Sequence, residues 1–242
     1  MQTVVRGRIG RGQKTYTISD CFTIIMSRKI HVAAVVGVAL LLATSGCIGF
    51  VLGDEPLEFE GSNATASGSG LEETGYTHEG SQSLREKRTI EDIDRDVVVE
   101  GHVNTYAKTD EFLDQEQQIA MFATASVPDA EVLGRSFNPL SEMSNEELLD
   151  RFQSEMPEQY SGTEFTVDES KAVDGVLGES ANVTRFTGTT EFEGQEVEVA
   201  VYITKVKHDG DWVVMMGAHP TQRPEEEFNI ETLMQSVEHG DE

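Results

Sequence analysis

The chain has 242 residues, with 18 Lys and Arg against 44 Asp and Glu, which gives a net charge of −26 at neutral pH. This length suits one domain of ordinary size with flanking segments. The acidic balance excludes a nucleic-acid-binding protein, because contacts to phosphates require clustered Lys and Arg.

Residues 1–25 are basic, with Arg6, Arg8, Arg11 and Lys14, and they precede Met26. An export signal normally lies at the very start of a chain, and a compact one would begin at Met26. We therefore interpret residues 1–25 as the product of a start codon assigned too far upstream. A genuine basic extension is the alternative.

Residues 26–46 have the pattern of a signal peptide. Arg28 and Lys29 form a basic start, the apolar run Val32–Ala43 follows, and small residues lead to Cys47. The end of this pattern resembles the lipobox of secreted lipoproteins, although Thr44 stands where an aliphatic residue is usual. The resemblance implies lipid attachment at Cys47 and a domain that faces outward from the cell membrane on a lipid anchor.

A second interpretation treats the same segment as an uncleaved anchor. The apolar run continues across the cysteine to Leu52, and about 20 apolar residues suffice to cross a hydrocarbon core. Arg28 and Lys29 favour the cytoplasmic side under both interpretations, so the domain faces outward in either case. The export route, general or twin-arginine, stays open.

Residues 47–75 have the composition of a flexible tether. Gly, Ser, Ala and Thr dominate positions 61–70, acidic residues lie on both sides, and no apolar period appears. Asn63 begins an Asn-Ala-Thr sequon in this stretch, and Asn182 begins an Asn-Val-Thr sequon further on. Both asparagines are possible N-glycosylation sites.

The charge becomes more extreme once the signal peptide is removed. Residues 1–46 hold six of the basic side chains and one of the acidic ones, so 12 basic and 43 acidic side chains remain, a net charge of −31. The acidic residues are dispersed among apolar segments, unlike those of an acidic tail. This pattern predicts a domain adapted to molar salt, where repulsion is screened. With Cys47 lipidated, no cysteine remains for a disulfide.

The first part of the domain predicts two strands and a helix. Val97, Val99 and Val103 alternate with polar residues, as in a half-buried strand, and Ile119–Val127 suits a central strand. Ser144 and Glu147 then form a capping-box pattern that begins a helix. The apolar face of that helix would contain Leu148, Leu149, Phe152 and Met156, with Pro157 ending it.

The second part predicts an antiparallel meander followed by a helix. The expected strands are 182–192, 196–208 and 212–218, and Asp209-Gly210 is a strong hairpin signal between the last two. We expect Asn229 to cap a closing helix with Ile230, Leu233, Met234 and Val237 on its apolar face. Residues 76–242 are thus predicted to form a single α+β domain, an antiparallel sheet with two packed helices.

This element order, with the closing helix 228–237 after a strand that contains Trp212, resembles the Mog1/PsbP-like α/β/α sandwich. The whole mature chain is also similar to a group of haloarchaeal lipoproteins of unknown function, which share its lipobox, acidic tether and domain length. The resemblance implies a binding or accessory scaffold without catalysis, and it carries no active-site motif onto this sequence.

Metal-binding patterns are incomplete. Asp92, Asp94 and Asp96 have the spacing of a calcium loop, but Val97 and Val103 stand where an EF-hand needs Gly and a bidentate Glu. The histidines show no paired ligand spacing. We therefore predict neither a metal site nor a cofactor.

Catalytic motifs are equally incomplete, because no serine lies in a nucleophile elbow and no phosphate loop occurs. Met215 and Met216 with Trp212 could line a ligand groove, but neighbouring strand positions face opposite sides, so we expect at least one methionine in the core and favour the core over a groove. The predicted function is a non-catalytic envelope module that binds a partner protein or small ligand. The alternative is an extracytoplasmic enzyme that uses dispersed carboxylates.

Overall fold

The computed structural model describes residues 56–240, with gaps at 91–94, 113–114, 133–134, 137, 154–162 and 193–194, as one unit. The predicted signal peptide and Cys47 lie outside the described residues. Among the residues that are described, no helix has the length and apolar character needed to cross a membrane.

Strands dominate the described chain. In chain order the elements are β1 (Leu57–Glu60), β2 (Asn63–Ala66), α3 (Gly68–Thr74), β3 (Thr77–Ile90), β4 (Arg95–Phe112), β5 (Gln115–Pro128), β6 (Glu131–Val132), β7 (Arg135–Ser136), the 3-10 turn η2 (Pro139–Ser141), α4 (Asn145–Phe152), β8 (Thr166–Val176), β9 (Glu179–Phe192), β10 (Gln195–His208), β11 (Asp211–Pro220), α5 (Glu225–Ser236) and β12 (Val237–Gly240).

Eight of these strands form one mixed sheet, in the order β1-β4-β5-β11-β10-β9-β8, with β3 also paired to β4. All the pairs are antiparallel except β1 with β4. The predicted hairpin between β10 and β11 is confirmed: Asp209 and Gly210 both have positive φ, at 46° and 94°, as expected in a tight turn between twisted strands.

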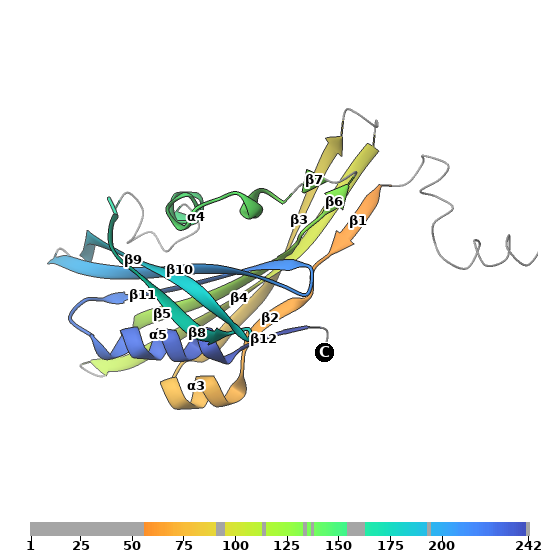
Figure 1. Ribbon diagram of the computed structural model, residues 1–242. Coiled ribbons are helices and arrows are strands. Elements are labelled where there is room, and N and C mark those ends of the chain that lie inside the picture. Colours follow the sequence, from red (N-terminus) through yellow and green to blue (C-terminus); the bar gives the residue numbers. More distant parts are fainter. Residues whose placement is uncertain are drawn as a thin grey trace, which may run out of the picture. The chain divides into compact units, whose positions relative to one another are not determined.

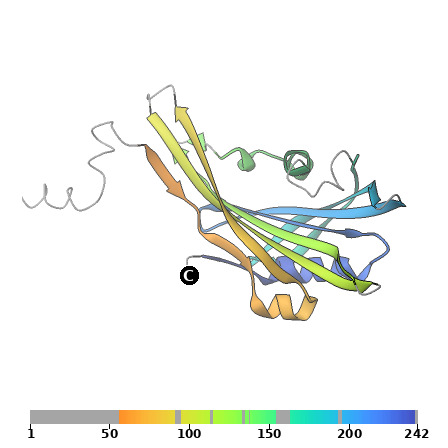
Figure 2. The same ribbon diagram turned by 180° about the vertical axis from the view of Figure 1, so that it is seen from behind.

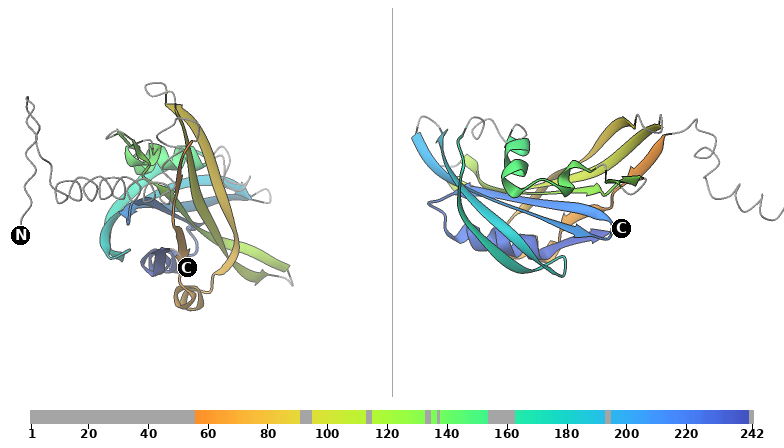
Figure 3. Two further views of the ribbon diagram at one scale, coloured as in Figure 1. Left: turned by 90° about the vertical axis from the view of Figure 1, so that its right-hand side faces the viewer. Right: turned by 45° about the horizontal axis from the view of Figure 1, so that its top comes forward.

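Helices cover both faces of the sheet. Helices α3 and α5 lie on one face and α4 lies on the other (Figure 1). Figure 2 shows the long β3–β4 hairpin rising on one side while β10 and β11 run to the other, with α4 above the sheet between them. The two views in Figure 3 agree with this placement. Alternate strand residues therefore face two separate cores.

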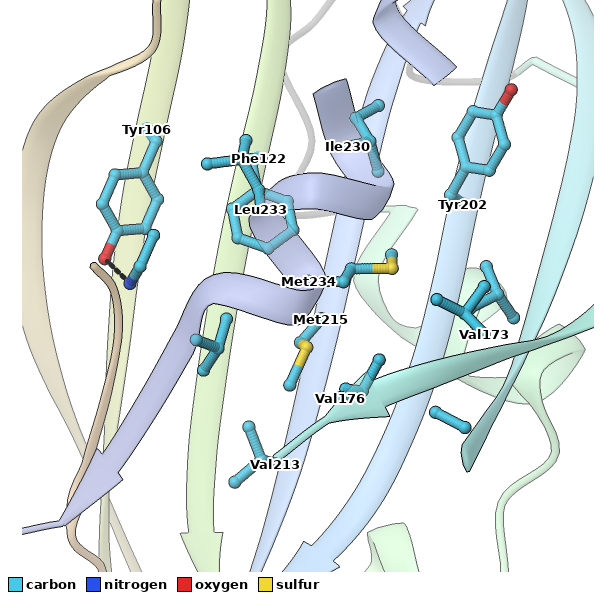
Figure 4. Packing of buried hydrophobic residues seen from close by; sticks show 14 of the residues in the cluster. Tyr106, Phe122, Val173, Val176, Tyr202, Val213, Met215, Ile230, Leu233 and Met234 are labelled. Carbon is cyan, nitrogen blue, oxygen red and sulfur yellow. Dashed lines mark hydrogen bonds between the residues drawn. The ribbon is translucent and has the colours of Figure 1, made fainter. Parts of the chain in front are cut away.

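The larger core lies between the sheet and α5. Phe122 and Met215 from the sheet meet Ile230, Leu233 and Met234 from α5, and all five side chains are fully buried. Figure 4 shows these side chains converging beneath the helix. The predicted helical spacing of Ile230, Leu233 and Met234 is thus confirmed, whereas Val237, also expected on this helix, lies in β12 and is buried in the same core.

The second core lies under α4, where Leu148 and Leu149 pack on sheet residues such as Val201 and Ile203. The predicted capping box is confirmed, because Ser144 accepts from the Glu147 amide and the Glu147 side chain accepts from the Ser144 amide. The ammonium group of Lys205 donates to the backbone carbonyls of Leu140, Ser141 and Met143 just before the helix. These bonds hold α4 at one place on the sheet.

The predicted fold class is wrong. The protein is mostly β, with a mixed sheet of eight strands and short helices on both faces, and is not a Mog1/PsbP-like α/β/α sandwich with two packed helices. The pattern-based interpretation missed β3 and β8 because their side chains are mainly exposed and polar. Such strands lack the apolar alternation that marks a half-buried strand.

The structure also differs from the prediction of a flexible tether at residues 47–75. From residue 56 onward this segment is folded, and its elements β1, β2 and α3 belong to the same unit as the sheet. Ala64 and Ala66 are buried, and Ser67 caps α3 by accepting from the Gly70 amide. The small side chains of this segment thus let it pack closely within the folded unit.

A smaller correction concerns Asn229, which lies inside α5 and does not cap it, since that helix begins at Glu225.

Candidate functional site: an apolar groove on the α4 face

A groove lies on the sheet face that α4 partly covers. It consists of two adjoining hollows of about 550 and 100 Å³. The larger is lined by Gln82, Leu84, Arg85, Glu86, Val103, Thr105, Met121, Ala123, Thr124, Ala125, Arg151, Phe152, Val214 and Met216, and the smaller by Leu84, Glu86, Arg88, Val97, Val99, Gly101, Ala125, Val127, Asn138, Leu140, Arg151 and Phe152. The site is thus built from β3, β4, β5, β11 and the end of α4.

Side-chain size explains why the sheet is hollowed at this point. Ala123 and Ala125 of β5 present short side chains between the longer ones of β4 and β11. Gly101 of β4 cannot be enlarged without a shift, because an added Cβ would lie 2.6 Å from the Ser126 carbonyl oxygen. The lining is therefore apolar, small at its centre and fixed by strand pairing.

Much of this lining is still accessible. Val103, Met121, Ala125 and Met216 are half-buried, and Leu84 is 48% exposed to solvent. Burying a fully exposed Val, Leu or Met side chain contributes roughly 1.5–3 kcal/mol, so covering the exposed part of these half-buried side chains would contribute only part of that each. The groove thus offers an apolar surface that the described part of the chain does not fully cover.

The charged residues of the groove carry more positive than negative charge, in contrast to the domain as a whole. Arg88 donates from Nε and Nη2 to Glu86 Oε1, at 2.9 and 2.7 Å, and Arg151 projects from the last turn of α4. Arg85 also borders the larger hollow, but its guanidinium group bonds Glu58 and Glu100. The charged residues of the lining are thus three arginines and one glutamate.

The methionine pair divides between the two faces of β11, as neighbouring strand residues must. Met215 is fully buried in the core beneath α5, so the core interpretation is confirmed for it. Met216 lines the groove and also packs, partly buried, against the α4-side core. Trp212 packs against the α4-side core, with the Lys205 ammonium 4.9 Å from its ring centre.

The structure does not bring the sequence-predicted site residues together. Asn63 lies in β2, where its Oδ1 accepts from Asn104 Nδ2 at 2.8 Å. Asn182 is exposed on β9, and its backbone carbonyl accepts from Thr204. Neither asparagine borders the groove, and Cys47 lies outside the described residues.

The rejected calcium-loop pattern has one described member, Asp96. Hydrogen bonds from Lys87 and Thr89 lower the pKa of this carboxyl group. Asp92 and Asp94 lie outside the described residues. Within the described ranges, no three His, Cys, Asp or Glu side chains are grouped so that they could hold a metal ion.

A cluster of Ser126, His239 and Asp211 has the residue types of a catalytic triad but not its geometry. Ser126 Oγ and Asp211 Oδ2 both lie 3.1 Å from the same ring nitrogen, His239 Nε2. A triad requires the serine and the carboxylate on opposite nitrogens. The other nitrogen, Nδ1, lies 3.0 Å from His208 Nδ1, and Ser126 is fully buried. The cluster therefore fastens β12 to the sheet and offers no accessible nucleophile.

A second polar network holds the start of α5. Glu226, only 1% exposed, accepts from Tyr76 Oη at 3.1 Å, Lys108 Nζ at 2.7 Å and Asn229 Nδ2 at 3.0 Å. Burial, with the nearby Glu226 charge, raises the pKa of Tyr76 well above its usual value. All the named partners belong to the protein itself, so this network is structural.

A third polar network centres on the hydroxyl group of Tyr202. Its hydroxyl donates to Glu227, accepts from Arg185 Nε and lies 3.3 Å from His219 Nε2. Burial raises the pKa of Tyr202 to about 12 and lowers that of His219. These groups also bond one another and do not border the groove.

Comparison with known proteins places the chain in a family. The model of DUF6517, a domain of unknown function, matches residues 63–238. The match covers most of the chain, which therefore belongs to this family. It starts at the first residue of β2, in agreement with the place of that strand in the folded unit. No curated protein matches the chain.

Proposed function

We propose that this member of the DUF6517 family is a non-catalytic, outward-facing binding module of the cell envelope, and that the apolar groove is its binding site. The observation that carries the proposal is the groove itself. It combines an apolar lining, a volume of about 550 Å³ and a few charged groups at its border. Sites for small molecules typically have such a lining and volumes of about 300–1,000 Å³.

The way the groove is built supports a role in binding. Its floor consists of paired strands, and α4 is held over the sheet by the Lys205 bonds to Leu140, Ser141 and Met143. A site on paired strands is largely formed before the ligand arrives, which lowers the entropy cost of binding. The polar clusters outside the groove are saturated by internal hydrogen bonds, which favours a binding role over a catalytic one.

Occupation of the groove can be tested by filling it. Ala125 borders both hollows, so Ala125→Leu adds three carbons at their junction. We expect the variant to weaken binding of the neutral apolar probe N-phenyl-1-naphthylamine at least tenfold, measured by fluorescence titration. Ala172→Leu is the matched control, since Ala172 is exposed on β8. Equal binding by the wild type and both variants, with unchanged melting temperatures, would contradict a site in the groove.

The proposed location rests on the sequence pattern before the domain. The predicted export signal at residues 26–46, the cysteine that follows it and the acidic composition favour a lipoprotein of the kind found in haloarchaea. Cys47→Ser should remove the lipid and release the protein from membranes in a detergent-partition assay. Intact-mass analysis should show the lipid on the wild type only. A variant that stays in the membrane fraction and retains residues 32–46 would favour the uncleaved anchor.

A further inference from the structure

We infer that the groove takes an uncharged ligand, a single aliphatic chain without an ionised group. This inference rests on the proposed function and specifies the ligand of the same site. Three observations support it: the charged side chains of the lining interact within the protein, its buried polar side chains are bonded there too, and its apolar path is elongated.

The charged side chains that line the groove already have partners inside the protein. Arg88 donates to Glu86 from both Nε and Nη2, so these two residues neutralise each other. The guanidinium group of Arg85 forms ion pairs with two carboxylates that lie outside the lining. Arg151 also has an interaction within the protein. A charged ligand group must therefore compete with an internal partner at each of these side chains.

The uncharged polar side chains of the lining are bonded in the same way. Thr105 and Thr124 donate their hydroxyl protons to backbone carbonyls. Asn138 donates to two backbone carbonyls and accepts from a backbone amide. Gln82 lies at the border and is exposed to solvent. An ionised end group that enters this lining loses its contacts with water without gaining an equivalent partner, which opposes its binding.

The groove is elongated along β4. Its lining runs from Val97 to Thr105 on this strand, and at about 3.3 Å per residue this corresponds to about 26 Å. The side chains that line the path from β5 and β11 include Met121, Ala125 and Met216. Methionine side chains adapt readily to flexible apolar ligands. A single linear aliphatic chain matches such a path.

The charge of the domain acts against ions of both signs at this site. From residue 47 onward acidic side chains outnumber basic ones 43 to 12, so the surrounding field repels anions. The same field attracts cations, but Glu86, the one carboxylate among the described lining residues, is bonded to Arg88. An uncharged chain is subject to neither effect.

The test compares three ten-carbon competitors of N-phenyl-1-naphthylamine on the full chain: 1-decanol, decanoate and decylammonium. The KCl concentration is the lowest at which the wild type is folded, so that salt screens the charges as little as possible. We expect 1-decanol to bind about tenfold more tightly than either ion, since each ion loses water contacts near its charge without gaining an equivalent partner.

Two substitutions break the ion pair of the lining in opposite senses. Glu86→Gln releases Arg88, so the affinity of decanoate relative to 1-decanol should rise about threefold, the size expected for an exposed charge pair. Arg88→Gln releases Glu86, so the affinity of decylammonium relative to 1-decanol should rise by a similar factor. Each variant thus admits the ion whose charge is opposite to that of the released side chain.

Lys87→Gln and Glu79→Gln are the matched controls. They remove one positive and one negative charge from β3, but Lys87 pairs with Asp96, Glu79 accepts from Thr77, and neither side chain lines the groove. Both controls should keep the relative affinities of the wild type.

Binding of either ion by the wild type as tightly as 1-decanol would overturn the inference of an uncharged ligand and leave the proposed binding groove intact. Relative affinities of Glu86→Gln and Arg88→Gln that equal those of the controls would also overturn it, because the internal ion pair would then not determine the preference. Failure of the probe and of every competitor to bind would overturn both proposals.

Discussion

Replacing Glu226 by alanine is expected to lower the free energy of unfolding by about 3–5 kcal/mol, the cost of removing one partner from a buried ion pair. The carboxylate is almost completely buried and accepts from Tyr76, Lys108 and Asn229. Its loss leaves the Lys108 ammonium, which is 22% exposed, without this counter-charge. It also leaves the buried Tyr76 hydroxyl without its acceptor. Because the bonds from Tyr76 and Lys108 tie Glu226 of α5 to the rest of the domain, the helix should loosen from the sheet.

Urea unfolding followed by the fluorescence of Trp212, the single tryptophan of the chain, measures the effect. Glu225→Ala is the control, because Glu225 precedes Glu226 in the first turn of α5 but is exposed. Both substitutions remove the same favourable interaction with the helix dipole, worth about 0.3–1 kcal/mol. Equal losses for the two variants would show that the buried network contributes nothing beyond the helix dipole.

The second large effect is expected from salt. The chain from residue 47 onward carries a net charge of −31, and even if all 12 cations form ion pairs, 31 acidic side chains have no counter-charge. Two like charges 10 Å apart repel by about 0.4 kcal/mol in water, so tens of such pairs oppose folding by several kcal/mol. At 1 M salt the screening length falls to about 3 Å. The internal pairs lose little in return, since exposed ones such as Lys87–Asp96 typically contribute at most about 1 kcal/mol.

Thermal melts of residues 48–242 across a KCl series provide the measurement. The midpoint should rise steeply from 0.1 M to about 2 M and then flatten, as screening becomes complete. A matched NaCl series should give the same curve if screening is the cause. A midpoint that is constant or falls with salt would contradict the haloadapted interpretation and would suggest that the acidity serves a cationic partner.

Local signals in the sequence were sufficient to predict several elements of the fold. The turn at Asp209-Gly210, the capping box of Ser144 and Glu147 and the helical spacing of Ile230, Leu233 and Met234 each depend on residues a few positions apart. Such short-range patterns can be recognised without knowledge of the fold.

The fold class and the groove depend on contacts between distant segments. Strand β5 lies between β4 and β11, and no local pattern specifies its pairing with β11 almost 90 residues later. Strand β3 provides Leu84 and Arg88 to the groove, but its exposed, polar sequence does not resemble a strand. Ala123 and Ala125 look like ordinary strand residues until their neighbours are known. Two signals pointed toward the site: the apolar strand patterns of β4 and β5, and the possibility that Met216 lines a groove.

The central claim, that the groove is the binding site, is tested most directly by nuclear magnetic resonance of the methionine methyl groups. Met121 and Met216 border the groove, whereas Met215 and Met234 are fully buried in the core on the opposite face. Titration with N-phenyl-1-naphthylamine should shift the signals of Met121 and Met216 and leave those of Met215 and Met234 in place. Shifts confined to Met215 and Met234, or saturable binding without any shift at Met121 and Met216, would contradict the account.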